Sequence, residues 1–310
     1  NMQNLNAEDM LEYMISDPGT GVIFIYLESM RNGRRLMELA RRSPKPIMIF
    51  KSNIGRLGQK IAMSHTASLT SDDRVVDAAF LQAGILRVRD ATSLGNSLKI
   101  LELPPMRGAR LAVISRSGGH AVIAADACEL SGFQLAHFPE SFLREIEKNF
   151  RASVIKLTNP LDLGDLFDLN VYAQIVEQTL QLEEVDGIVF LHTAISEAEN
   201  LATRMLLERI IELVKKYDKP VAFYVSTSAQ EVVNLKATYP FPIFTQVVET
   251  VRALEMSYAA WFGMGKAHAG DKVASFKVDK AKVRSLLGSA QAVGRDLLLT
   301  EALEVLEHYG

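Results

Sequence analysis

The stretch ARLAVISRSGGHAVIAADACELSG, residues 109–132, decides the fold class of this chain. An unbroken apolar run leads through a glycine-containing turn into a segment with helical periodicity, which ends at Gly132. A strand that lacks polar alternation is typical of a parallel sheet with helices on both faces. This strand–turn–helix unit therefore predicts an open α/β domain.

The same alternation of apolar runs and helical segments recurs along the chain. Further apolar runs of strand length lie at residues 21–27, 44–52, 185–192, 219–226 and 241–244. Helical periodicity lies at residues 7–15, 70–82, 197–216, 229–236 and 246–262. We therefore expect an α/β protein with two doubly wound parallel-sheet domains, of the flavodoxin or Rossmann type.

Domain boundaries are indicated by composition. The sequence PPMRG at residues 104–108 is the clearest break between the two alternating series. We expect one domain over residues 1–105, a second over 106–265, and a tail, residues 266–310, that carries helical signals without strand partners. Both ends are abrupt for doubly wound domains, so we expect a piece of a longer polypeptide.

Composition argues against several classes of protein. The 34 basic and 37 acidic residues give a net charge of −3, without the basic excess that nucleic acid or an anionic membrane attracts. No apolar run reaches the ~18 residues of a membrane span. The single cysteine, Cys128, cannot form an internal disulfide and reads as a core residue. With no signal-peptide pattern at the N-terminus, we expect a cytoplasmic protein.

The loop KSNIGRLGQKIAMSHTASL, residues 51–69, is the first candidate site. It follows a strand and is too long for a simple connection, and ligands of open α/β sheets bind at the carboxyl ends of strands. Neutral imidazole can take a phosphoryl group on nitrogen, and small residues around His65 leave room for one. Considered alone, the loop favours an ordinary exposed histidine. Thr70 or Ser71 can cap the helix that follows.

Two further candidates lie where strands end. Ser117, Gly118 and Gly119 stand at a strand–helix junction, where backbone N–H groups and the helix dipole can hold phosphate. A tight turn capped by Ser117 is the alternative. Glu28 directly follows the first apolar run and can orient an imidazole through one ring nitrogen, although a solvated glutamate is the simpler interpretation when it is taken alone.

The remaining candidates carry weaker signals. Asn159 and Asp162 belong to TNPLDLGD, residues 158–165, which is either a loop near a site or only a turn. His192 ends an apolar run; a role without chemistry is the simpler interpretation, and the alternative is that it faces the same ligand edge. We find no zinc-ligand spacing and expect no metal site in this chain.

Five segments in this order resemble the NDP-forming (ADP-forming) acyl-CoA synthetases, relatives of succinyl-CoA synthetase. They are residues 22–28, 45–88, 112–136, 159–165 and 299–310. The resemblance implies two succinyl-CoA-synthetase-like domains. It also implies the reaction of acyl-CoA, ADP and phosphate to acid, CoA and ATP, through an acyl phosphate and a phosphohistidine.

The resemblance also implies roles for individual residues. His65 falls on the phosphohistidine of a swinging loop, and Glu28 falls on the glutamate that steadies it. Ser117, Gly118 and Gly119 fall on one of two phosphate-facing helix N-termini, and the loop of Asn159 and Asp162 falls near the same site. The family commonly has glycine at position 67 and often proline at position 120, where this chain has alanine and histidine.

The family resemblance further implies partners and cofactors. The intact enzyme uses CoA, ADP or ATP, Mg²⁺ and a small-molecule acid, and it has CoA-binding and ATP-grasp domains in a homo- or hetero-oligomer. For this chain we expect phosphate as the only ligand, residues 300–310 as the start of an ATP-grasp domain, and no activity alone. Two alternatives stay open: a synthetase-like regulatory region of a protein lysine acetyltransferase, and a non-catalytic subunit-docking module.

Overall fold

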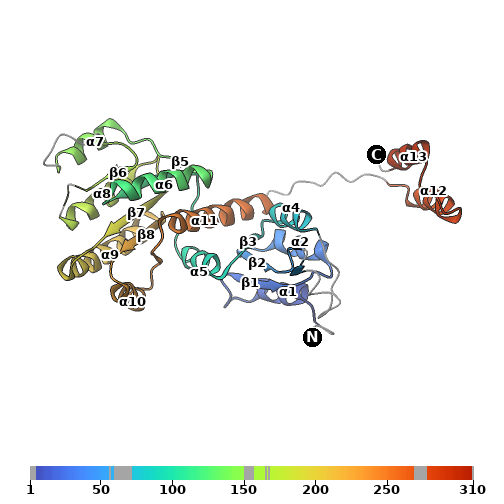
Figure 1. The fold of residues 1–310 in the computed structure, drawn as a ribbon, viewed down its shortest axis with the longest axis horizontal. Coiled ribbons are helices and arrows are strands. Elements are labelled where there is room, and N and C mark those ends of the chain that lie inside the picture. The colour runs from blue at the N-terminus through green and yellow to red at the C-terminus, as the bar shows by residue number, and fades with distance from the viewer. Residues whose placement is uncertain are drawn as a thin grey trace. The chain divides into compact units, whose positions relative to one another are not determined.

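The computed structural model describes residues 5–55, 57–58, 72–149, 157–164, 166, 168–268 and 278–308 (Figure 1). The chain divides into two compact units, Asn1–His268 and Ala269–Gly310. Among the described residues, none of the helices is both long enough and apolar enough to cross a bilayer.

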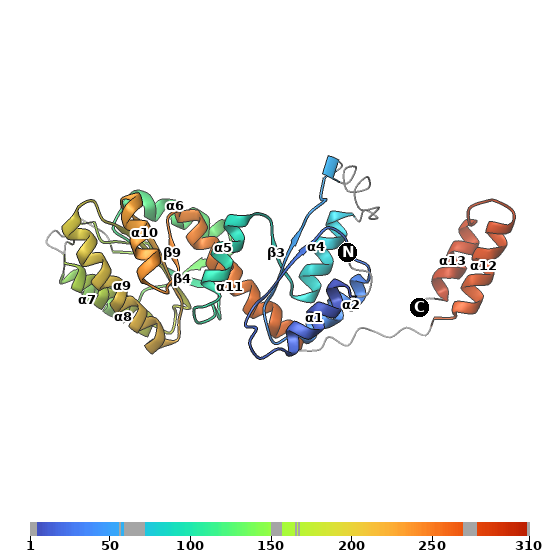
Figure 2. The same cartoon turned by 90° about the horizontal axis from the view of Figure 1, so that it is seen from below.

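The first unit contains two sheets, and the smaller one has three parallel strands. Their order is β1-β2-β3, with bounds β1 (Ile23–Leu27), β2 (Ile47–Lys51) and β3 (Leu86–Val88). The helices of this region are α1 (Ala7–Ser16), α2 (Gly33–Arg42), α4 (Asp73–Ala83) and α5 (Ala91–Ile100). Helices α1, α2 and α4 lie on one face of the sheet, as Figure 2 shows from below, and their apolar side chains pack there against β1 and β2.

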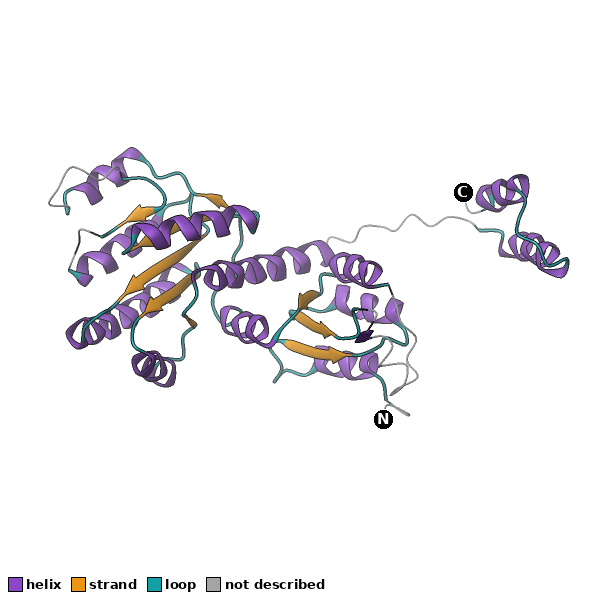
Figure 3. Cartoon of the chain, in the orientation of Figure 1, coloured by secondary structure: helices purple, strands orange, loops and turns teal. Residues whose placement is uncertain are grey.

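The second sheet has six strands, and every pairing in it is parallel. The strands are β4 (Arg110–Ser115), β5 (Gln134–Leu135), β6 (Leu161–Asp162), β7 (Gly187–Thr193), β8 (Val221–Ser226) and β9 (Ile243–Phe244). Their order is β5-β4-β7-β8-β9, and β6 also pairs with β4. The chain therefore first moves to one side of β4 and later crosses to β7 on its other side. This confirms the doubly wound fold class (Figure 3).

Helices cover both faces of this second sheet. They are α6 (Gly118–Leu130), α7 (Glu140–Glu147), α8 (Leu169–Gln181), α9 (Glu197–Tyr217), α10 (Ala229–Thr238) and α11 (Val247–His268). Residues of α6 and α11 pack on one face, and residues of α7 to α10 pack on the other. Burial from both sides explains why these strands read as continuous apolar runs. Cys128 is buried in this core, as expected.

Helix α11 packs on both sheets of the first unit. Its Leu254 lies in the core of the larger sheet, while Ala260 packs against Met48 of the smaller one. Close approach is needed at Gly84, which ends α4 with φ 69°, because a Cβ on Gly263 of α11 would lie 3.1 Å from the Gly84 Cα. The sequence predicted this helix only to residue 262, because the small residues that follow are poor helix formers.

The second unit contains the helices α12 (Lys280–Ala292) and α13 (Leu299–Glu307). Arg295, in the turn between them, donates hydrogen bonds to the Glu301 carboxylate at 2.7 and 2.8 Å. These bonds hold the pKa of Glu301 down at about 2. The turn is thereby tied to the first turn of α13.

Candidate functional site

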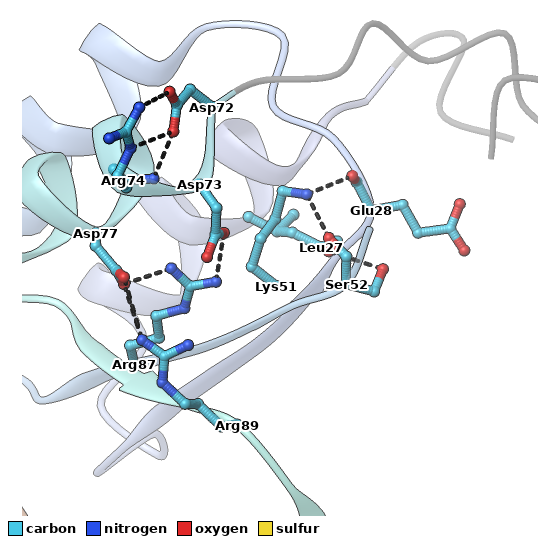
Figure 4. Close-up of polar contacts among 10 residues, drawn as sticks. All are labelled: Leu27, Glu28, Lys51, Ser52, Asp72, Asp73, Arg74, Asp77, Arg87 and Arg89. Carbon is cyan, nitrogen blue, oxygen red and sulfur yellow. Dashed lines mark hydrogen bonds and ion pairs between the residues drawn. The ribbon is translucent and has the colours of Figure 1, made fainter. Parts of the chain in front are cut away.

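The carboxyl edge of the smaller sheet places Glu28 beside Lys51 (Figure 4). The Lys51 ammonium is buried and donates hydrogen bonds to the backbone oxygens of Glu28, at 2.8 Å, and Ser52. Burial lowers the pKa of Lys51, although Asp73 opposes this. The Glu28 carboxylate is exposed, points away from Lys51, and has no hydrogen-bond partner among the described residues. Its backbone is fixed while its carboxylate is free to take a partner.

The predicted carrier, His65, lies outside the described residues, with the rest of residues 59–71. Of its loop, the structure describes residues 52–55 and 57–58, which follow β2, and on the second flank Asp72, which precedes α4. Capping of α4 by Thr70 or Ser71 was a wrong expectation, because Asp72 is the N-cap and its carboxylate accepts the Arg74 N–H at 2.9 Å. Aspartate caps as well as serine and stands directly before the first helical residue.

A group of ion pairs anchors the second flank to the sheet. Arg87 of β3 is almost buried and donates hydrogen bonds to Asp73, at 2.6 Å, and to Asp77, both on α4. Burial works against the charged form of Asp77, but hydrogen bonds from Arg87 and Arg89 outweigh it and lower its pKa. Sequence reasoning missed this anchor. The spacing of Asp73 and Asp77, one helical turn apart and followed by Arg87 and Arg89, could have indicated it.

At the second site, the turn between β4 and α6 is held by a serine that the sequence did not single out. The Ser115 hydroxyl donates to the Ser117 oxygen at 2.7 Å and accepts the Ser117 N–H at 3.1 Å. The Ser117 side chain makes no capping hydrogen bond, contrary to the alternative that it caps the helix. The first turn of α6, with Gly118 and Gly119 exposed, therefore presents backbone N–H groups to solvent.

Asp162 and Asn159 have different places in the structure. Asp162 pairs with Ser115 in the sheet, and one of its carboxylate oxygens lies 2.9 Å from where a Cβ on Gly118 would be. A side chain at position 118 would have to displace this carboxylate, which lies at the positive end of α6. Asn159 instead accepts the Val113 N–H at 2.9 Å and donates to two further backbone oxygens. Asp162 thus lies at the candidate phosphate turn, whereas the Asn159 side chain links strands.

An ion pair lies at the carboxyl ends of β4 and β7, where the strand order reverses and doubly wound sheets bind ligands. Arg116, directly before the turn, donates to the Thr193 oxygen at 2.5 Å and to the Glu199 carboxylate at 2.6 Å. Glu199 also accepts the Ile195 N–H. This hydrogen bond has the largest effect in lowering the pKa of Glu199, and the bond from Arg116 has the next largest. The ion pair joins the candidate phosphate turn to the β7–α9 connection. Sequence reasoning missed it because the partners are far apart along the chain.

His192 does not face this edge, which contradicts the alternative that it takes part in the site. Its side chain is fully buried, and Nε2 lies 2.9 Å from the Thr203 hydroxyl, which itself donates to the Glu199 backbone oxygen. Nε2 therefore carries the proton, and Nδ1 has no partner among the described residues. Burial lowers the pKa of His192 to about 4, so it is neutral near pH 7.

Comparison with known proteins agrees with this architecture. Residues 1–101 match the family model described as succinyl-CoA ligase like flavodoxin domain. Acetate–CoA ligase (ADP-forming) II of Archaeoglobus fulgidus is 32% identical over 81% of this chain and 38% of its own length. The alpha subunit of acetate–CoA ligase (ADP-forming) I of Pyrococcus furiosus is 30% identical over 83% and 56%.

A solved structure is similar as well. The dinucleotide forming acetyl-coenzyme A synthetase 1 of Ca. Korarchaeum cryptofilum, in complex with phosphate and ADP, superposes with a TM-score of 0.74 at 26% identity. The superposition covers 87% of this chain and 59% of that one.

The smaller sheet and its helices are thus a succinyl-CoA ligase-like flavodoxin domain. The chain as a whole is related to the ADP-forming acyl-CoA synthetases, as the resemblance implied. It spans 38% and 56% of the two curated relatives that we describe.

Proposed function

We propose that this chain is the phosphoryl-relay segment of an ADP-forming acyl-CoA synthetase. The observation that carries the proposal is the geometry of one sheet edge. The loop that bears His65 leaves β2 at Lys51 and returns at Asp72, where the Arg87 anchor fixes the start of α4. The free carboxylate of Glu28 lies at the same edge (Figure 4). Glu28 is therefore the residue that we propose as the partner of His65.

The proposed chemistry has one acyl transfer followed by two phosphoryl transfers. Phosphate displaces CoA from acyl-CoA to form an acyl phosphate. A neutral His65 nitrogen then attacks phosphorus, so that an N–P bond forms, the P–O bond to the acyl group breaks, and the acid leaves. ADP finally takes the phosphoryl group and regenerates the imidazole. Glu28 accepts a hydrogen bond from the other ring nitrogen and stabilises the positive charge that develops there.

The first turn of α6 is proposed as a phosphate contact during this transfer. Backbone N–H groups of Gly118 and Gly119 and the hydroxyl of Ser117 supply donors at the positive end of a 13-residue helix. Asp162 lies against Gly118, and its negative charge disfavours tight retention of a phosphoryl group. We propose that this balance favours onward transfer. Asn159 does not contact the phosphate but stabilises β4, the strand before the turn, by accepting the Val113 N–H.

The complete reaction needs further domains. We propose ligase domains at residues 1–105 and 106–265, with 266–310 as the start of an ATP-grasp domain. CoA, the acid, and ADP or ATP with Mg²⁺ bind to CoA-binding and ATP-grasp domains or subunits of the whole cytoplasmic enzyme. The alpha subunit among the relatives supports such a division. On this proposal the present chain does not turn over by itself.

Labelling of the histidine tests the proposal. The chain is incubated with acetyl phosphate that carries a labelled phosphoryl group, and we expect an acid-labile, base-stable label. His65→Ala abolishes it and Glu28→Gln slows its formation, whereas the control His137→Ala, at an exposed histidine, retains it. A folded chain that takes no label contradicts the relay and favours the acetyltransferase-type regulatory region or the docking module. A label that survives in His65→Ala contradicts the assignment of the residue.

A further inference from the structure

A cleft lies beside β9, the edge strand of the larger sheet. It has a volume of about 250 Å³ and is lined by α5, by the last turn of α10 and by the turn from β9 into α11. Strands β7 and β8 separate β9 from β4 and its phosphate turn. The cleft therefore belongs to a different part of the molecule from the proposed relay site.

Lys99, which points into this cleft, differs from the other partly buried lysines. Lys45, Lys51 and Lys219 each donate hydrogen bonds to two backbone oxygens. Lys99 is comparably buried but has no hydrogen bond or ion pair among the described residues. A half-buried ammonium group without an acceptor is unfavourable, so a ligand that supplies one is favoured.

A second cation lines the same cleft. Lys236, in the last turn of α10, also has no polar partner among the described residues. Both lysines line the cleft; burial lowers the pKa of Lys99, and the positive charge of Lys236 lowers it further. Both lysines lie in the last turn of a helix, where the helix dipole favours a positive charge. The dipole does not remove the repulsion between the two ammonium groups.

The acid in the cleft does not neutralise these lysines. Glu249 accepts hydrogen bonds from Arg252, at 3.2 Å, and from Asn96, at 3.4 Å. Its charge is therefore shared with another cation. The cleft retains a positive excess and adds neutral donors in the hydroxyls of Thr92 and Thr245.

Gly95 keeps the cleft open from the side of α5. Glycine is a poor helix former, and a Cβ at this position would meet no atom within 4 Å. Packing inside the protein thus gives no reason for glycine in the middle of this helix. A ligand that occupies the open space supplies one.

We propose that this cleft binds a small phosphate-bearing anion between Lys99 and Lys236. The volume lies below the ~300–1,000 Å³ of pockets for drug-sized ligands, so the ligand is no larger than pyrophosphate or a short phosphate monoester. Its phosphoryl oxygens accept hydrogen bonds from both ammonium groups and from Thr245. Since α5 adjoins the smaller sheet and α10 the larger one, bound anion also joins the two halves of the first unit.

Calorimetric titration of the whole chain tests this proposal. The probes are inorganic pyrophosphate and glycerol 3-phosphate, at constant ionic strength. Lys99→Met and Lys236→Gln are each expected to weaken binding about tenfold or more. Lys215→Met removes the same charge from an exposed position on α9 and is expected to leave the affinity unchanged.

A further variant tests whether binding depends on the open space of the cleft as well as on its charge. Gly95→Leu keeps both lysines, improves the helix and fills the cleft, so it is expected to abolish binding while the protein stays folded by circular dichroism. Tight binding of only one probe supports the proposal and identifies the ligand as a diphosphate or a monoester. If neither probe binds, the proposal is overturned. It is also overturned if Lys99→Met binds a probe as tightly as the wild type does, because the probe then binds at another site such as the α6 turn.

Discussion

Buried His192 makes the stability of the larger sheet sensitive to acid. Its pKa is 6.5 in an exposed setting and about 4 in the folded protein, because the ring is removed from water and Arg116 lies nearby. Between these values the unfolded chain binds a proton that the folded chain does not. The stabilisation is therefore fully present above pH 6.5 and is lost as the pH falls towards 4.

The size of this effect follows from the two pKa values. At about pH 5 the linkage relation gives a loss of about 2 kcal/mol in the free energy of unfolding, and complete protonation costs about 3 kcal/mol. His192→Gln removes the titration and keeps an N–H donor within reach of Thr203, so this variant is expected to lose about 2 kcal/mol less than the wild type on acidification.

Urea unfolding, followed by fluorescence, measures this difference. The single tryptophan, Trp261, lies in α11 and reports on the first unit. The free energy of unfolding is compared at about pH 7.5 and about pH 5 for the wild type, His192→Gln and the control His137→Gln, which changes an exposed histidine. Equal acid sensitivity of the wild type and His192→Gln would refute the reasoning.

Three further substitutions probe the scaffold. Asn159→Leu orphans three backbone groups and is expected to cost about 3 kcal/mol or more in urea unfolding; a loss below about 1 kcal/mol contradicts this. Gly263→Val pushes α11 away from Gly84 and is expected to lower the free energy of unfolding by about 1–3 kcal/mol. Calorimetry should therefore show a lower Tm, and an unchanged Tm contradicts this. Arg87→Met unpairs Asp73 and leaves Asp77 with Arg89 alone, so amide exchange in α4 is expected to accelerate and His65 labelling to slow; unaltered exchange speaks against the anchor.

The fold class and much of the site's framework could be predicted from the sequence. Apolar runs that lack alternation indicated parallel strands covered on both faces, and the end of the first run placed Glu28 at a strand terminus. The glycine pair at Gly118 and Gly119 indicated a strand–helix turn. These features are local, because strand and helix periodicities and turn residues act over a few positions. Local patterns also located the loop of His65, whose role stays a proposal.

Only the tertiary structure decided which distant side chains meet. Arg116 and Glu199 are 83 positions apart, and the sheet order brings them together at one sheet edge. Burial of His192, and the lack of a polar partner for Lys99 within the described part of the chain, likewise depend on how helices cover the sheets. The physical reason is that periodicity determines which face of an element is apolar. The neighbours of a polar group at the end of an element depend on which strands pair and how closely the helices pack.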